Sequence, residues 1–350
     1  MAQALRLGKE YHGRQTPLER ETRRRIMWTC FIVDRLLALV SSRRYAIPRD
    51  SLTIQLPCPE DAFLFEEAMP GPTLHDFSAE VGTRNLLAQT VKSIEAWGEM
   101  AHHFATGTRL TSVTSALDRE NEFYQSEQLT KGLIMALPRR LKWSLQNYAT
   151  HRALGVGCLF ATHLFILNQA ACLAHQDYLP QIGQDSLLRV AEEPTAHQAS
   201  AMPSTRLSQT DEYMISTCLF HAEEIRSIAI HMFGGDQVDR AYMRTPFCGV
   251  ALVTAAGIFL WHAYFAEEQL AEFPDNGLQI PSSKMKVQQI AQMIDLWKDD
   301  WKIAQTWCET IELLNLVYAA AYKKPEIEFE HVNLATRDSS ARRPHSEEPL

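Results

Sequence analysis

The stretch that decides the fold lies at residues 19–48 and reads ERETRRRIMWTCFIVDRLLALVSSRRYAIP. It sets arginines beside a nearly unbroken apolar run and ends in a proline. On a helical wheel one face of this stretch, with spacings of four, three and four residues, carries Arg24, Trp28, Phe31 and Arg35. Arginine can stack on aromatic rings at this spacing. The pattern therefore predicts a helix over 19–41 with arginines packed against its aromatic residues.

A second apolar face follows the same helix and consists of Ile26, Cys30, Val33, Leu37 and Val40. With apolar residues on two faces, little of the helix is left for water, and we expect it to be buried. A membrane span is excluded here, because Asp34 and Arg35 interrupt the apolar run far short of the roughly 20 residues that a span needs.

The arginines could instead form a nucleic-acid-binding arm, but acidic residues are interleaved with them. Glu21 and Arg25 have the i,i+4 spacing of a helical ion pair, which favours structural pairing over phosphate contact. Asp34 lies among apolar neighbours, and a buried carboxylate needs a cation or several donors. We predict that Asp34 is buried and pairs with an arginine just after the helix, Arg43 rather than Arg44.

These residues resemble a known family pattern. The sequence MAQALRLGKE…PLERETRRRIMWTCFIVDRLLALVSSRRYAIPRDSLTIQLP is similar to the middle homology region of fungal zinc-cluster transcription factors, the fungal-specific transcription factor domain. The positions that match the family motif include Arg23, Arg24, Arg25, Trp28, Phe31, Asp34, Arg35, Arg43 and Pro48. Met27 departs from the family's tryptophan pair, and Ser42 and Arg44 replace the glycine and proline around Arg43. Looser similarity continues in order to about residue 320.

Composition places the chain among ordinary globular proteins. Its 350 residues are 46% hydrophobic and 22% charged, with a formal net charge of −8. Residues 1–50 carry 11 Lys and Arg against 5 Asp and Glu, which is +6, so the remaining 300 residues carry −14 and would repel phosphate. The 7 cysteines are widely separated and form no CxxC pair, which indicates free thiols rather than a disulfide framework or a thiolate zinc site.

Helical periodicity dominates the chain, and almost no segment alternates with period two. We expect an all-α fold: a large multi-helix regulatory domain over residues 1–325, forming one continuous helical body. The expected helices span residues 1–9, 19–41, 83–105, 111–136, 139–176, 211–234, 246–269 and 284–323. Between them, 46–63 should be extended because of its prolines, and 180–211 should be a mobile loop. Residues 326–350 are expected to be a disordered tail.

Residues 247–265 contain no charge over 19 positions and match a transmembrane span in length. We expect a core helix of a soluble protein instead, because Gly249, Thr254, Gly257 and His262 soften the run and no second clear span accompanies it. The aromatic stripe of Trp297, Trp301, Ala304, Trp307 and Cys308 is interpreted as a packing face.

Chemical motifs are weak. Gly155 and Gly157 give only a GxG with no preceding strand, and HAEEIRSIAIH (221–231) lacks the spacing for a shared metal. The acidic residues of DLWKDDW (295–301) lack the DDxxD spacing of a diphosphate-binding helical enzyme. We therefore predict no catalytic residue, no metal site and no cofactor in this chain. The rival hypotheses are an unrelated all-helical metabolic enzyme and a membrane-associated helical protein.

The resemblance implies a nuclear regulator of transcription that is not an enzyme. In such proteins a separate Cys-rich module binds two zinc ions and reads DNA, and that module is absent here, so DNA contact would need a part upstream of this chain. The helical region would modulate activity by sensing a small-molecule effector, by binding co-regulator proteins or by forming a homodimer. A pocket containing His163 and His262 is the candidate effector site.

Overall fold

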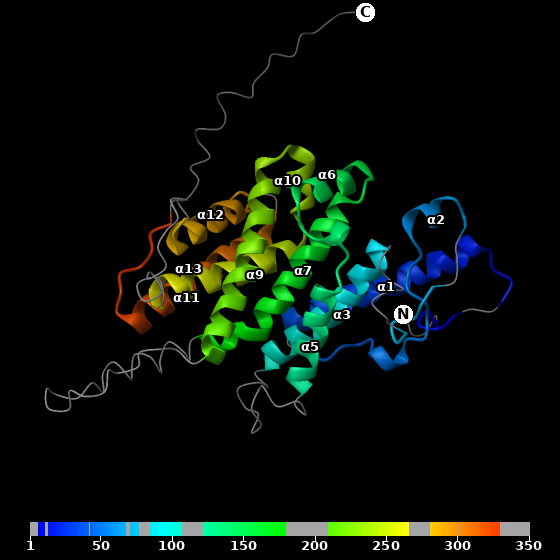
Figure 1. The fold of residues 1–350 in the computed structure, drawn as a ribbon, viewed down its shortest axis with the longest axis horizontal. Helices are drawn as coiled ribbons and strands as arrows, with labels where there is room; N and C mark the ends of the chain where they lie inside the picture. The colour runs from blue at the N-terminus through cyan, green and yellow to red at the C-terminus, as the bar shows by residue number, and fades with distance from the viewer. Residues whose placement is uncertain are drawn as a thin grey trace, which may run out of the picture.

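The computed structural model describes residues 6–10, 13–41, 43–67, 71–76, 85–106, 122–179, 209–265, 281–299 and 301–329. Within these ranges the protein is all-α, as predicted: no strand forms, and a single bridge joins Gln55 and Thr73. The α-helices are α1 (Pro17–Ser41), α2 (Glu60–Leu64), α3 (Leu86–Thr106), α5 (Glu122–Met135), α6 (Leu145–Ala153), α7 (Gly157–His175), α9 (Gln209–Gly234), α10 (Gln237–Tyr242), α11 (Pro246–Phe265), α12 (Ser283–Asp295) and α13 (Lys302–Tyr322) (Figure 1).

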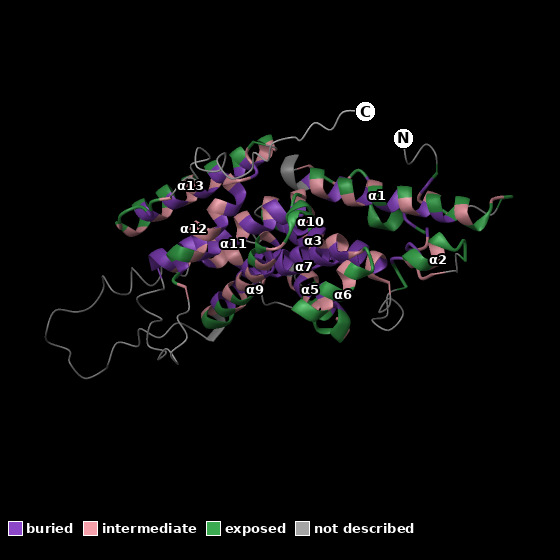
Figure 2. Ribbon diagram, turned by 90° about the horizontal axis from the view of Figure 1, so that it is seen from above, coloured by how far each residue is buried: buried purple, intermediate pink, exposed green. Residues whose placement is uncertain are grey.

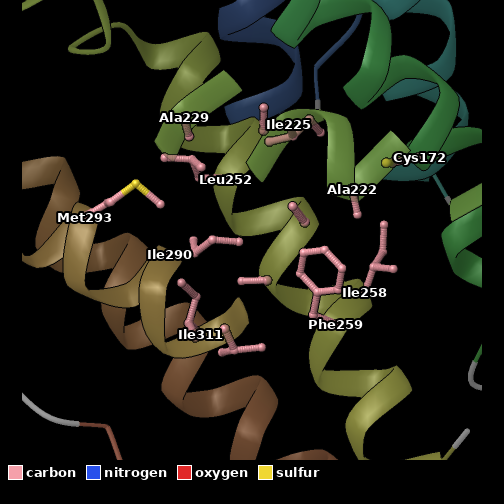
Figure 3. Close-up of a cluster of buried hydrophobic side chains, with 14 of the residues drawn as sticks. Cys172, Ala222, Ile225, Ala229, Leu252, Ile258, Phe259, Ile290, Met293 and Ile311 are labelled. Carbon is pink, nitrogen blue, oxygen red and sulfur yellow. The ribbon is translucent and has the colours of Figure 1, made fainter. Parts of the chain in front are cut away.

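Helices α7 and α11 form the centre of the body, because their sequences are apolar on nearly every face. α7 packs on α3, α9 and α11, and α11 packs on α12 and α13. A large apolar cluster fills the space between α9, α11, α12 and α13 and includes Ile225, Leu252, Phe259, Ile290 and Ile311 (Figure 3). Residues 247–265 are thus a core helix, as predicted from the sequence.

Among the residues that the structure describes, two helices, rather than the one expected from the sequence, are long and apolar enough to cross a membrane by length and composition alone: the segment Gly157–Tyr178 and α11. The share of the tested window that lies buried inside the protein is 83% for the first and 72% for the second. In Figure 2 α7 and α11 accordingly show mostly buried residues, whereas exposed residues recur along α1 and α13. A buried core helix accounts for the apolar composition of both.

A second apolar cluster joins the N-terminal region to the rest. Trp28, Phe31 and Trp97, from α1 and α3, pack there with Ile166 of α7 and Phe247 of α11. The Trp97 Nε1–H donates to Gln169 Oε1 at 2.9 Å, and the Trp97 ring meets Phe247 edge-on with centroids 5.3 Å apart. The N-terminal region is therefore closed by helices that follow much later in the chain.

Several expected helices are wrong in detail. The predicted helix over 139–176 is two helices, α6 and α7, because Gly155 takes a left-handed conformation (φ 76°) at the break between them. The predicted helix over 284–323 is also two, α12 and α13, separated by a turn that leads into Trp301. Residues 6–8 form a turn rather than part of the helix expected at 1–9.

The second apolar face of α1 is not buried, which corrects the sequence prediction. Ile26, Val33 and Leu37 are 48%, 46% and 50% exposed, and Cys30 is half-buried. Helical periodicity finds both apolar faces, but the face that carries Trp28 and Phe31 supplies the buried contacts, and of the second face Cys30 alone among the described side chains packs against the cluster.

The tryptophan-rich segment packs inward, as predicted. Trp297 and Trp307 are buried, and the Trp307 ring lies edge-on to both Trp297 and Trp301. Gly249 of α11 makes this possible, because a Cβ there would overlap the Trp307 ring. Most of the loop expected at 180–211 and most of the tail expected at 326–350 lie outside the described residues. At the start of that tail, however, Ile327 is buried and its N–H donates to Tyr264 Oη at 3.0 Å.

Candidate functional site

The residues of the N-terminal motif meet along the inner face of α1, where residues 43–60 run back over the helix. We call these residues the 43–60 segment. Trp28 Nε1–H donates to the Gln55 carbonyl of this segment at 2.7 Å, and Met27, in place of a tryptophan, is buried beside it. Pro48 is exposed and precedes the short 3-10 turn Arg49–Ser51. The motif therefore fixes one segment of chain against one helix.

Asp34 is the polar centre of this contact. Its carboxylate is 5% exposed and accepts hydrogen bonds from Arg43 (2.8 Å), Arg35 (3.2 Å) and the backbone N–H groups of Ala46 (3.1 Å) and Ile47 (2.9 Å). Burial would raise the pKa of Asp34, but the hydrogen bonds from Ile47, Arg43 and Ala46 outweigh it and hold the pKa below its ordinary value. The predicted pairing of a buried Asp34 with Arg43 is confirmed.

Arg35 is 1% exposed, which is unusual for a guanidinium. It lies between two rings, with its Cζ 4.0 Å from the centroid of Phe31 and 3.9 Å from that of Tyr45. Arg35 also donates to the Ile47 carbonyl at 2.9 Å, and the Tyr45 hydroxyl donates to the Gly98 carbonyl of α3. Stacking and pairing thus offset part of the hydration that the cation loses, although Nε has no hydrogen-bond partner among the described residues and burial lowers the pKa of Arg35.

The remaining arginines of the motif are also committed to contacts within the protein. The buried Glu21 carboxylate binds Arg24 at 3.3 Å and Arg25 at 3.2 Å and accepts the Cys58 N–H at 2.9 Å. Arg24 also binds Glu10 at 2.8 Å, and Arg25 binds Glu60 at 2.6 Å. The ion pair predicted from the Glu21–Arg25 spacing is confirmed. Arg23 is half-exposed.

Sequence reasoning missed several members of the site. Glu10, Tyr45 and Glu60 supply a carboxylate, a ring and a second carboxylate from positions distant from their partners in the chain. Local spacing cannot reveal such pairs. The one available signal was that three consecutive arginines need more carboxylates than Glu21 alone can offer.

The two histidines proposed for an effector pocket are not brought together. Cys158 of α7 lies near Tyr242 just before α11, and Gln169 bonds Thr254 further along both helices, so α7 and α11 run parallel. His163 is therefore level with the early part of α11, whereas His262 lies in its last turn, about 20 Å further on at 1.5 Å per residue. Neither histidine lines any of the cavities described below.

Each of these histidines has a structural partner instead. His163 is fully buried and its Nδ1 lies 3.3 Å from Ser93 Oγ, while His262 Nδ1 lies 2.8 Å from Ser283 Oγ. Burial, with a contribution from His151, lowers the pKa of His163 to about 4. His163 is thus a neutral core residue at physiological pH.

Among the described residues no three His, Cys, Asp or Glu side chains gather in a way that could hold a metal ion. All seven cysteines are free thiols, and five of them are buried. Burial raises the pKa of Cys58 to about 11 and of Cys248 to about 12, so neither is a thiolate at neutral pH.

Comparison with known proteins agrees with this geometry. The family model for the fungal specific transcription factor domain matches residues 1–103, which include α1, the 43–60 segment and nearly all of α3. An uncharacterized transcriptional regulatory protein of Schizosaccharomyces pombe is 22% identical over 355 residues, which cover 92% of this chain and 48% of that protein. No solved structure gives a significant match.

A second relative, a Zn(2)-C6 fungal-type transcription factor of Fusarium oxysporum f. sp. lycopersici, is 30% identical over 176 residues, covering 43% of this chain and 19% of that protein. This chain therefore spans about half the length of the first relative and a fifth of the second. The match to the fungal specific transcription factor domain covers residues 1–103, and the similarity to a fungal transcriptional regulatory protein extends beyond residue 103.

Proposed function

We propose that this chain is the regulatory region of a fungal zinc-cluster-type transcription factor, which acts in the nucleus and modulates transcription of target genes without being an enzyme. The observation that carries the proposal is the N-terminal motif: its sequence matches the family, and its arginines bind carboxylates of the protein itself. DNA would be contacted through a separate zinc-cluster module, and the region described here would hold no cofactor of its own.

The geometry suggests how such a region would transmit a signal. The 43–60 segment is tied to α1 through Asp34 and Glu21, and Tyr45 ties the same segment to α3. α3 in turn packs on the central helix α7. A ligand or partner protein that prefers one packing of these helices would shift the population between two states. The N-terminal motif would then report the state of the core.

A tethering experiment tests the regulatory role. The full chain is fused to a heterologous DNA-binding module and directed to a reporter promoter, and transcription is compared with that given by the module alone. We expect the fusion to change reporter output. Equal output from the fusion and the bare module, at equal protein level and with the fusion in the nucleus, would refute the proposal.

Two variants locate the effect. Asp34→Asn weakens the bonds that hold the 43–60 segment, whereas Asp50→Asn removes the same charge from an exposed position in the same segment. We expect the first to alter reporter output and the second to leave it unchanged.

A further inference from the structure

A pit of about 280 Å³ opens between α5, α7 and α9; α7 packs on both α5 and α9, and α5 lies at the lower side of the helical body in Figure 1. Its floor is made of buried residues, among them Thr130, Ala171 and Ala174. Its mouth lies at Met135 and Tyr213, which are 81% and 40% exposed. The volume is close to the lower limit of about 300 Å³ for small-molecule sites. The pit is therefore large enough for a small molecule and open to solvent.

His221 presents a hydrogen-bond acceptor at this pit. Asn168 Nδ2 donates to the Leu164 carbonyl at 2.9 Å, so Asn168 Oδ1 is an acceptor, and His221 Nδ1, 2.7 Å from it, must carry the proton. Burial, with a contribution from His175, lowers the pKa of His221 to about 4, so the ring is neutral. In this tautomer Nε2 holds a lone pair that a hydroxyl group can meet.

The charged groups of the pit balance one another. Glu127 is 3% exposed and binds Lys131 at 2.6 Å and His175 at 3.2 Å. Burial would raise the pKa of Glu127, but the bonds to His175 and Lys131 outweigh it and keep the carboxylate ionised. The Lys131 ammonium also lies 4.8 Å from the centroid of the Tyr213 ring and has further donor capacity. The pit thus offers a donor and an acceptor without an uncompensated charge.

We propose that this pit binds a small, uncharged, mostly apolar molecule that carries a hydroxyl group, such as a phenol. The hydroxyl would donate to His221 Nε2 and accept from Lys131, while the apolar body would rest on Ala171, Ala174 and Ile134. Because Lys131 and Glu127 already form an ion pair, the described lining of the pit has no free charge to compensate an ionised ligand, and a carboxylate has no proton to donate to His221 Nε2; both facts favour an uncharged ligand. The ring of Tyr213 at the mouth favours an aromatic body.

Other cavities fit a ligand less well. A larger one, of about 690 Å³, is a shallow surface hollow whose lining includes Arg44, Arg49 and Glu99. A groove of about 370 Å³ beside α2 and α6 is lined by charged Glu60, Asp61 and Arg140 at its edges. Neither has a floor of buried residues with a convergent donor and acceptor.

Binding is tested by titrating the full chain with three probe molecules of matched shape. Ligand-observed NMR measures the affinity of each probe. We expect 4-ethylphenol to bind about tenfold more tightly than 4-ethyltoluene, which lacks the hydroxyl, since a pair of hydrogen bonds is worth about one to two kcal/mol. We expect 4-ethylbenzoate to bind more weakly than the phenol. Absence of phenol binding, equal binding of the toluene, or tighter binding of the benzoate would each overturn the assignment.

Two variants on α9 localise the probe. Thr217 lines the pit and is only half-exposed, so Thr217→Phe would fill the space and should weaken phenol binding at least about tenfold. Ser216→Phe adds the same ring at the neighbouring exposed position and should leave binding unchanged. Equal phenol affinity in both variants would place the probe elsewhere and overturn the proposal.

The regulatory meaning of this pit, as the effector site, rests on the proposed function, but the binding itself does not. The two can fail separately. If the tethered chain regulates the reporter but binds no phenol, the binding proposal is refuted and the proposed function stands. If the chain binds the phenol in the pit but has no effect on the reporter, the proposed function is refuted and the binding proposal stands.

Discussion

Replacing Asp34 by alanine should be among the most damaging single changes on the surface between α1 and the 43–60 segment. The substitution leaves the guanidinium of Arg35, 1% exposed, without its carboxylate, and it strands the buried N–H of Ile47. Breaking a buried ion pair by removing one partner costs about 3–5 kcal/mol. We expect the free energy of unfolding of Asp34→Ala to fall by that amount.

Arg43→Ala provides the matched comparison. Arg43 contacts the same carboxylate, but its side chain is 37% exposed, so water can replace it and the expected loss is about 1 kcal/mol or less. Urea unfolding of the full-length variants, followed by circular dichroism, measures both. An Asp34→Ala midpoint equal to that of the wild type, or a larger loss in Arg43→Ala, would refute the reasoning.

The pH dependence of the same group has a definite sign. The pKa of Asp34 is lower in the folded protein than its ordinary value of 3.8, so the folded state binds the proton less readily than the unfolded chain. The stabilisation is therefore complete above about pH 4 and is lost as the pH falls through the folded pKa. Asp34→Asn should remove this part of the acid sensitivity.

Four further outcomes are expected. Gly249→Ala should lower the free energy of unfolding by at least about 2–3 kcal/mol, because the new methyl group overlaps the Trp307 ring. Gly257→Ala, whose Cβ would lie 3.4 Å from Leu314, should be near neutral, and thermal unfolding compares the two variants. The pKa of His163 is about 4 in the folded protein against an ordinary 6.5, so the free energy of unfolding should fall as the pH drops below 6.5, by about 2 kcal/mol at pH 5. In a His163→Gln variant, the free energy of unfolding measured in urea should depend less on pH over this range. The chain alone should bind DNA without sequence specificity, with a Kd of about 10⁻⁴–10⁻⁶ M that weakens with salt; nanomolar binding of one short motif in a fluorescence-anisotropy titration at two salt concentrations would contradict this. Expression without detergent should leave the protein in the supernatant, and quantitative recovery in a carbonate-resistant membrane pellet would show that α11 is not a soluble core helix.

The predictions that were confirmed rest on residues that lie close together in the sequence. Asp34 and Arg43 are nine residues apart, Glu21 and Arg25 are four apart, and both pairs form within one helix and the turn that follows it. The charge-free run at 247–265 is a core helix because few other places in a helical protein suit such a sequence. These features depend on a short stretch of chain and on burial, which a sequence reveals directly.

The rest depended on which surfaces meet. Periodicity identified two apolar faces on α1 but could not tell that the one with Ile26 and Val33 stays exposed. The sequence shows a glycine at position 155, but it does not show that this glycine takes the left-handed conformation that ends the helix there. The pit is built from three helices whose contacts are set by tertiary packing, so spacing along the sequence could not show that His175 and His221 both line it.

The packing around Trp97 bears on how this protein can change over evolution. Sequence similarity to the family is concentrated in residues 1–103, but the apolar cluster that holds α1 and α3 is completed by Ile166, Ala170 and Phe247. A fragment cut at residue 103 would expose that cluster to water and strand the indole N–H of Trp97. Helices α7 and α11, which lie beyond the matched residues, must therefore keep their shape where they meet α1 and α3, so substitutions at Gln169 and Phe247 should be matched by changes in α3.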